Sequence, residues 1–168
     1  MSPQRGQAVA VVTDSTAALL PALAQEAGVA VVPLHVHVGE ITTLEGAGVD
    51  EATAAVLRGD RVTTSQPTPE AFAERYAALA AAGAREIVSI HLSGTVHAAA
   101  LAAHRAPVPV RVVDSRVVGM GLGFAVLAAA RVATSGASAA DVEGVALETA
   151  RSASGFFLVD SLEHLRRG

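Results

Sequence analysis

Two short segments of the sequence combine small hydroxyl side chains with the predicted start of a helix. Ser93-Gly94-Thr95 follows an apolar run, and Thr63-Thr64-Ser65 precedes a second predicted helix. A helix N-terminus offers free backbone N–H groups and a partial positive charge, and both attract anions. Because Gly94 leaves the backbone unshielded, an anion such as a carboxylate can approach and accept a hydrogen bond from Ser93. We therefore interpret both segments as candidates for anion binding.

Two other interpretations of Ser93 stay open. A serine at the start of a helix is often only an N-cap. A nucleophilic serine would need a histidine base and an acid that orients it. His91 and His97 are near in the sequence, but the flanks do not form the Gly-x-Ser-x-Gly pattern. We expect these histidines to lie in a loop or on a helix surface, and we predict no catalytic residue.

Two further patterns suggest a metal or a cofactor only weakly. His35 and His37 share one face of a predicted strand, a spacing that can hold a metal ion, but no third ligand is evident. The segment from Gly119 to Gly123 is glycine-rich, yet Phe124 stands where the third glycine of a dinucleotide fingerprint should fall. Small residues that let a helix pack closely on a sheet explain that segment better. We therefore predict neither a metal nor a cofactor.

Asp14 and Asp114 each stand at the end of a predicted strand. Aspartates at such places can bind a cation or act in acid–base chemistry. More often they accept hydrogen bonds from backbone N–H groups and stiffen a turn. The sequence leaves both interpretations open.

Strands and helices that alternate along the chain must position these segments. Short apolar runs predict buried strands at 9–12, 29–38, 86–90 and 110–113, with an irregular connection at 39–49. Helices are predicted at 21–28, 50–57, 70–82, 93–104, 120–133 and 138–152; Thr68 and the pair Ser138 and Asp141 serve as N-terminal caps. This alternation predicts an α/β fold, a mostly parallel sheet with helices on both faces.

In such a sheet, ligands bind beyond the carboxyl ends of the strands. That rule selects Asp14–Thr16, Leu92–Thr95 and Asp114–Arg116. The polar loop Thr63–Pro67 enters a helix N-terminus and can join them.

The composition limits the function further. Hydrophobic residues make up 51% of the 168 residues and aromatic residues 3%, so Ala, Val and Leu must build the core. A net charge of −4, with scattered arginines and no lysine, argues against nucleic acid or an anionic membrane as the main partner. The chain has no cysteine, which excludes disulfides and cysteine nucleophiles. Without a signal peptide or a long apolar run, we expect a cytoplasmic protein without stable membrane insertion.

Several motifs together resemble the DegV family. Four of them occur in order: Asp14-Ser15-Thr16-Ala17 with Pro21, Thr64-Ser65-Gln66-Pro67, Leu92-Ser93-Gly94-Thr95, and Asp114-Ser115-Arg116 with Met120-Gly121-Leu122-Gly123. The segment from Phe157 to Leu165 is similar to the one that crosses into the family's second domain. The resemblance implies an N-terminal α/β domain over residues 1–155 and the beginning of a second domain at 156–168.

Members of that family bind a long-chain fatty acid between two α/β domains, and some serve as the carrier subunit of a fatty acid kinase. The resemblance implies that Thr64 and Ser93 bind the ligand carboxylate, while Ser65, Gly94 and Thr95 shape the pocket. A separate kinase catalytic subunit is then a possible partner, and an exposed apolar surface favours a homodimer. Two alternatives stay open: an α/β enzyme that uses Ser93 or Asp114 on a small acid or phosphate ester, and a degenerate half-protein without a tight ligand.

Overall fold

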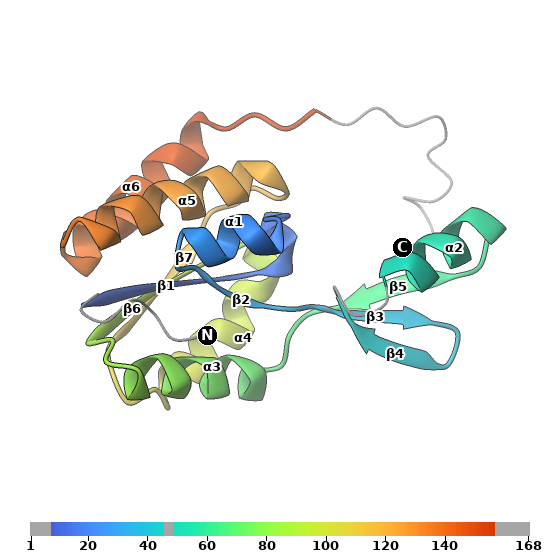
Figure 1. The fold of residues 1–168 in the computed structure, drawn as a ribbon, viewed down its shortest axis with the longest axis horizontal. Coiled ribbons are helices and arrows are strands. Elements are labelled where there is room, and N and C mark those ends of the chain that lie inside the picture. The colour runs from blue at the N-terminus through green and yellow to red at the C-terminus, as the bar shows by residue number, and fades with distance from the viewer. Residues whose placement is uncertain (1–7, 46–48, 157–168) are drawn as a thin grey trace.

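The computed structural model describes residues 8–45 and 49–156 (Figure 1). The predicted beginning of a second domain lies, apart from Phe156, outside the described residues. In the described ranges, no helix combines the length and the apolar character that crossing a bilayer requires.

The central sheet has four parallel strands in the order β2-β1-β6-β7. They are β1 (Val9–Asp14), β2 (Ala30–Val32), β6 (Glu86–His91) and β7 (Val110–Asp114). Each pairing is parallel, and the register places His91 of β6 opposite Asp114 of β7. The predicted α/β fold with a parallel sheet is therefore confirmed.

Helices cover both faces of this sheet because side chains alternate along each buried strand. Val9 and Val11 of β1 enter one hydrophobic core, whereas Ala10 and Val12 enter the other. The first core contains buried residues of α1 (Pro21–Glu26), α5 (Met120–Thr134) and α6 (Ala139–Ser152). The second contains buried residues of α3 (Pro69–Ala81) and α4 (Ser93–Ala103). The two layers are visible above and below the sheet in Figure 1.

A second sheet lies beyond the carboxyl end of β2 and was not predicted (Figure 1). It is antiparallel, in the order β4-β3-β5, and consists of β3 (His35–Val38), β4 (Ile41–Leu44) and β5 (Val62–Ser65). The helix α2 (Val49–Arg58) contacts β3 and β5.

Three sequence predictions were therefore wrong in this region. The predicted strand at 29–38 divides between two sheets at Pro33, which lacks a backbone N–H and cannot continue a ladder. The segment predicted as irregular contains β4, because Gly39 adopts a positive φ of 59° that permits a tight hairpin turn. The predicted polar loop forms β5 as far as Ser65, since Val and Thr suit a paired strand.

The predicted helix caps are confirmed. Thr68 accepts a hydrogen bond from the backbone of Ala71 at the start of α3. Ser138 and Asp141 form a reciprocal capping box at the start of α6. These caps fix where two of the longer helices begin.

The glycine-rich segment at the start of α5 permits a close approach of backbone, as its small residues indicated. The backbone N–H of Gly119 donates to the carbonyl of Thr16 at 2.7 Å. A Cβ atom at Gly123 would lie 2.7 Å from the backbone oxygen of Ala17. That oxygen belongs to the short 3-10 helix η1 (Ser15–Ala17), which directly follows β1. Gly123 therefore lets α5 pack against the end of β1.

We expect Gly123→Ala to lower the free energy of unfolding by about 1–3 kcal/mol, because backbone rather than a flexible side chain blocks the new methyl group. Gly144 on α6 is the matched control, since a Cβ there meets nothing within 4 Å. Gly144→Ala should raise stability by up to about 1 kcal/mol through helix propensity. Urea unfolding followed by circular dichroism measures both. Equal stability of Gly123→Ala and wild type would contradict the close approach of α5 to η1.

Candidate functional site

Three of the predicted motifs meet at the carboxyl edge of the parallel sheet. β1 ends at Asp14, β6 at His91 and β7 at Asp114, on adjacent strands. The backbone N–H and the hydroxyl of Ser115 both donate to the carbonyl of His91, at 2.9 and 2.8 Å. The prediction that these motifs share one edge is confirmed.

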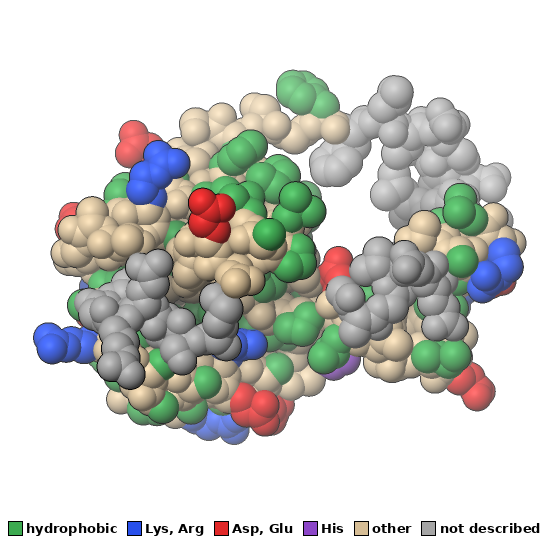
Figure 2. Space-filling view, in the orientation of Figure 1, with side chains coloured by type: hydrophobic (Ala, Val, Ile, Leu, Met, Phe, Trp, Pro, Cys, Tyr) green, Lys and Arg blue, Asp and Glu red, His purple; other side chains and the backbone are tan. Residues whose placement is uncertain are grey.

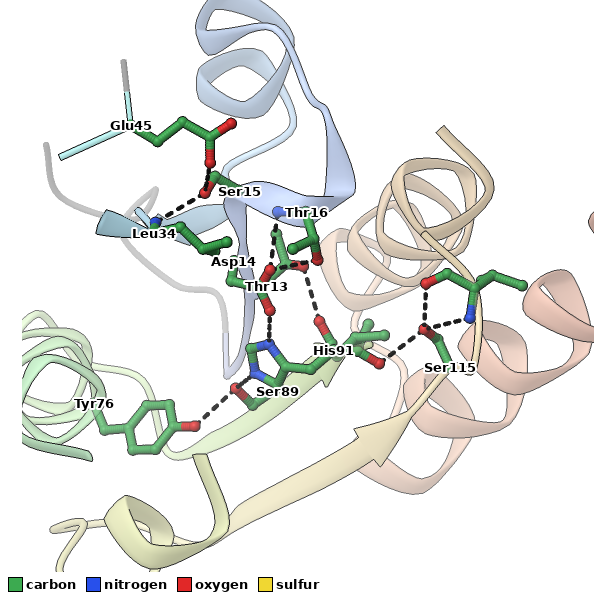
Figure 3. A network of polar contacts seen from close by, with 12 residues as sticks. Thr13, Asp14, Ser15, Thr16, Leu34, Glu45, Tyr76, Ser89, His91 and Ser115 are labelled. Atoms are coloured by element: carbon green, nitrogen blue, oxygen red, sulfur yellow. Dashed lines mark hydrogen bonds and ion pairs between the residues drawn. The ribbon is translucent and has the colours of Figure 1, made fainter. Parts of the chain in front are cut away.

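A buried chain of polar side chains lies under this edge (Figure 3). The hydroxyl of Tyr76 donates to Ser89 Oγ at 2.8 Å, and Ser89 Oγ lies 2.6 Å from His91 Nε2. His91 Nδ1 lies 2.6 Å from Asp14 Oδ2. All four residues are fully buried, and the ring of Phe72 packs edge-on against the imidazole with centroids 5.0 Å apart.

The Asp14 carboxylate fixes one proton in this hydrogen-bonded chain. An ionised carboxylate only accepts, so His91 Nδ1–H donates to Asp14. His91 Nε2 shares the next hydrogen bond with Ser89 Oγ, and the same oxygen accepts from Tyr76. Each of these polar groups has a hydrogen-bond partner, as buried polar groups require.

Asp14 connects this buried chain to the surface of the edge. Its Oδ1 accepts from the backbone N–H of Thr16 at 2.9 Å and so caps η1. Burial raises the pKa of the Asp14 carboxyl, but hydrogen bonds from His91 and Thr16 and the charge interaction with His91 outweigh burial, so the pKa lies below its ordinary value. At Tyr76, burial raises the pKa to about 12, so its hydroxyl keeps its proton near neutral pH.

The order Ser89–His91–Asp14 has the connectivity of a catalytic triad, but its serine is enclosed. A substrate cannot reach a side chain that is 0% exposed and already hydrogen-bonded to Tyr76. The expectation that His91 lies in a loop or on a helix surface was wrong, because His91 ends the central strand β6. The missed signal is the alternation Ser89-Ile90-His91, which places both polar side chains on one face of an apolar strand.

Ser93 opens the first turn of α4 but does not cap it. Leu92 occupies the N-cap position without a side-chain hydrogen bond. The Ser93 hydroxyl instead donates to Asp114 Oδ1 at 2.8 Å. The N-cap interpretation of Ser93 is therefore wrong, because Ser93 is already the first helical residue and Leu92 precedes it at the cap position. Ser93 and Gly94 are both exposed, whereas Thr95 is buried and faces the core.

The residue that follows the second hydroxyl segment, Gln66, contacts the first turn of α4. A Cβ atom at Gly94 would lie 2.9 Å from Gln66 Nε2, so this side chain rests against the first turn of α4. Thr64 and Ser65 are the last two residues of β5 and are exposed, and Gln66 directly follows them. Because they are neighbours on a strand, their side chains point to opposite faces of the small sheet.

His37 holds one of these hydroxyls on the small sheet. Its Nε2 lies 2.9 Å from Ser65 Oγ and its Nδ1 lies 2.8 Å from Thr42 Oγ1. Within the described ranges, no three His, Asp or Glu side chains are grouped closely enough to hold a metal ion. The two contacts of His37 connect Ser65 of β5 to Thr42 of β4.

Ser15 joins the two sheets at the site. Its Oγ accepts from the backbone N–H of Leu34, in the connection between β2 and β3, at 2.9 Å. The Ser15 hydroxyl donates to Glu45, which directly follows β4 (Figure 3). These bonds fix the end of β1 to the start of the small sheet.

Comparison with known proteins gives one consistent family. A family model described as an uncharacterised protein of the DegV family matches residues 8–168. A DegV domain-containing protein of Streptomyces coelicolor is 47% identical over 167 residues, which cover 95% of this chain and 59% of the relative. A DegV domain-containing protein of Deinococcus radiodurans is 37% identical over 171 residues, with 94% and 58% covered. The chain thus spans about three fifths of these relatives.

Solved structures agree with this result. DegV of Bacillus subtilis, described as a fatty acid binding protein, matches with a TM-score of 0.85 and 30% identity, covering 95% of this chain and 60% of that one. A DegV family protein from Thermus thermophilus, solved in a study of its fatty acid binding, matches with a TM-score of 0.82 and 37% identity, covering 95% and 59%.

The buried hydrogen bonds that connect Tyr76, Ser89, His91 and Asp14 should contribute strongly to the protein's stability. We expect His91→Ala to lower the free energy of unfolding by about 3–5 kcal/mol, because it leaves the Asp14 carboxylate buried without its partner. Tyr76→Phe removes only the terminal donor and should cost about 0.5–1.5 kcal/mol. Urea unfolding measures both. A smaller loss for His91→Ala than for Tyr76→Phe would contradict the central place of the Asp14–His91 pair.

The same pair predicts how stability depends on pH. The pKa of the Asp14 carboxyl is lower in the folded chain than its ordinary 3.8. Its contribution to stability is therefore fully present above that value and is lost as the pH falls through the folded-state pKa. The free energy of unfolding, measured from pH 7 to pH 2, should fall more steeply below pH ~4 for wild type than for Asp14→Asn. The asparagine keeps an acceptor oxygen but does not titrate. Parallel profiles would show that Asp14 is not the responsible group.

Proposed function

This chain belongs to the DegV family, and from that premise we propose that it binds a long-chain fatty acid through its carboxylate. The observation that carries the proposal is that Gln66, which directly follows the exposed hydroxyls of β5, contacts the helix N-terminus that carries Ser93. Ser93 and Gly94 form the open first turn of α4, and Gln66 brings the end of β5 against it. The fatty acid binding described for the proteins of B. subtilis and T. thermophilus supports the same conclusion.

In this proposal, Thr64 and Ser93 donate hydrogen bonds to the ligand carboxylate. Ser65 and Gly94 shape the pocket around it, and the buried Thr95 supports the turn of α4 from beneath. The Gln66 amide lies in the space that a side chain at Gly94 would fill, so a carboxylate at the free N–H groups of the helix also lies beside this amide. The hydroxyl of Ser93 must then turn from Asp114 toward the ligand.

The acyl chain needs an apolar surface next to this headgroup site. Leu20, Met120 and Phe124 are exposed at the starts of α1 and α5. Figure 2 shows hydrophobic side chains gathered on the side of the large body that faces the small sheet. Each CH2 group buried on such a surface contributes about 0.8 kcal/mol. We place the acyl chain along this face.

We propose a cytoplasmic lipid carrier, or the subunit that presents the fatty acid to a separate kinase catalytic subunit. The exposed apolar side chains next to the site also favour a homodimer in the absence of another partner. We do not propose catalysis by this chain, because the Ser93 hydroxyl is hydrogen-bonded to a carboxylate and not to an imidazole base.

Replacing both proposed donors tests the site. Thr64→Ala/Ser93→Ala should retain little or none of the long-chain fatty acid that wild type carries, because each lost hydrogen bond to a charged group weakens binding by about tenfold or more. Native mass spectrometry of gently purified protein, with organic extraction of the ligand, measures this. Thr134→Ala/Ser135→Ala, at the far end of α5, is the matched control and should bind like wild type.

Two results would contradict the proposal. Equal retention by wild type and by Thr64→Ala/Ser93→Ala would exclude these hydroxyls from the headgroup site. A wild-type protein that is empty and also fails to take up added palmitate or oleate would exclude fatty acid binding by this chain.

A further inference from the structure

The first turn of α4 already faces a carboxylate, which belongs to the chain itself. Asp114 ends β7, and its Oδ1 accepts from Ser93 Oγ at 2.8 Å and from the backbone N–H of Arg116 at 3.1 Å. A negative charge at this position interacts favourably with the positive end of helix α4. Asp114 therefore occupies the kind of position that a ligand anion would occupy.

Asp114 and a ligand carboxylate need the same proton. Ser93 has one hydroxyl proton, and in the structure it is donated to Asp114. An ionised carboxylate carries no proton of its own to replace it. A fatty acid carboxylate at Ser93 must therefore take that hydrogen bond from Asp114 and must also stand near a second negative charge, which is unfavourable.

Arg116 is placed to offset this charge. Its Nε lies 3.7 Å from Asp114 Oδ2, and its side chain is 85% exposed. Its backbone has a positive φ of 58°, an uncommon conformation for a residue with a side chain. The backbone hydrogen bond to Asp114 holds the residue there, so one carboxylate fixes both Ser93 and the neighbouring cation.

We propose that Asp114 is an internal competitor for the ligand carboxylate at Ser93, and that Arg116 limits the strength of that competition. This inference rests on the proposed function. It makes Asp114 a specificity-determining residue, because the repulsion from its charge acts on an ionised headgroup and not on a neutral one of the same acyl chain. The affinity for a fatty acid is then set below the value that the hydroxyls alone would give.

Asp114→Asn tests the competition, because it keeps the shape and an acceptor oxygen but removes the charge. We expect it to bind oleate about 3- to 10-fold more tightly than wild type, the size of effect typical of one partly exposed charge. Its affinity for methyl oleate should be unchanged. Arg116→Gln should bind oleate about threefold more weakly, since the offsetting charge is gone. Equilibrium dialysis with labelled oleate and methyl oleate, both delivered from the same cyclodextrin carrier, measures these affinities.

Asp60→Asn is the matched control, because Asp60 also pairs with an exposed arginine, Arg58, but lies outside the site. It should leave both affinities at the wild-type values. Thermal unfolding shows whether Asp114→Asn is folded. If that variant does not fold, Asp114→Ser is used instead, because serine also keeps an acceptor without a charge. The same sign of effect on oleate is expected from either variant.

The outcomes separate this inference from the proposed function. If wild type binds oleate and the uncharged variant binds it equally or more weakly, the competition is excluded while fatty acid binding stands. A gain of equal size for methyl oleate would also exclude it, because the effect would not depend on the headgroup charge. If neither wild type nor the uncharged variants bind oleate, the proposed function fails and this inference fails with it.

Discussion

The interaction on which the rest of this structure depends is the buried contact between Asp14 and His91. A carboxylate without access to water must be paired and hydrogen-bonded, or its burial is strongly unfavourable. Asp14 meets that requirement with the imidazole of His91 on one side and the backbone of Thr16 on the other. The end of β1, the end of β6 and the start of η1 are therefore held in one arrangement.

The exposed site is built directly on this buried support. Only Leu92 separates His91 from Ser93, so the position of the imidazole also fixes where α4 begins. The carbonyl of His91 accepts from the backbone N–H and from the hydroxyl of Ser115, which places β7 and its terminal Asp114 beside Ser93. Strands and a helix, rather than long loops, hold the backbone of these residues at the candidate site. The buried histidine thus positions Ser93 and Ser115 at the candidate site.

The small sheet supplies the other half of the site and is attached by few contacts. Ser15 bonds the connection that leads into β3 and the residue that follows β4. Gln66 rests on Gly94, where any side chain would displace it. Gln66 directly follows the hydroxyls of β5, so its contact with Gly94 ties the end of the small sheet to the first turn of α4.

Local patterns in the sequence were sufficient for most of the parallel domain. The apolar runs, the cap at Thr68 and the box at Ser138 are signals within a few residues, and strand alternation follows from them. The family motifs were also present in the sequence, and they named the hydroxyls at Thr64 and Ser93. The small sheet escaped prediction because its strands are short and polar, and their pairing is decided by partners elsewhere in the chain.

Tertiary structure alone decided which polar residues touch. Asp14 and His91 are 77 positions apart, and Ser93 and Asp114 are 21 apart, so no local pattern could pair them. His91 looked like a loop residue because its burial depends on helices that pack over β6, not on its own neighbours. The sequence by itself determined the elements and the candidate hydroxyls, since these follow from local propensity and periodicity. The register of the parallel strands decided which polar side chains are paired, because it brings side chains that are distant in the sequence within hydrogen-bonding distance at one edge of the sheet.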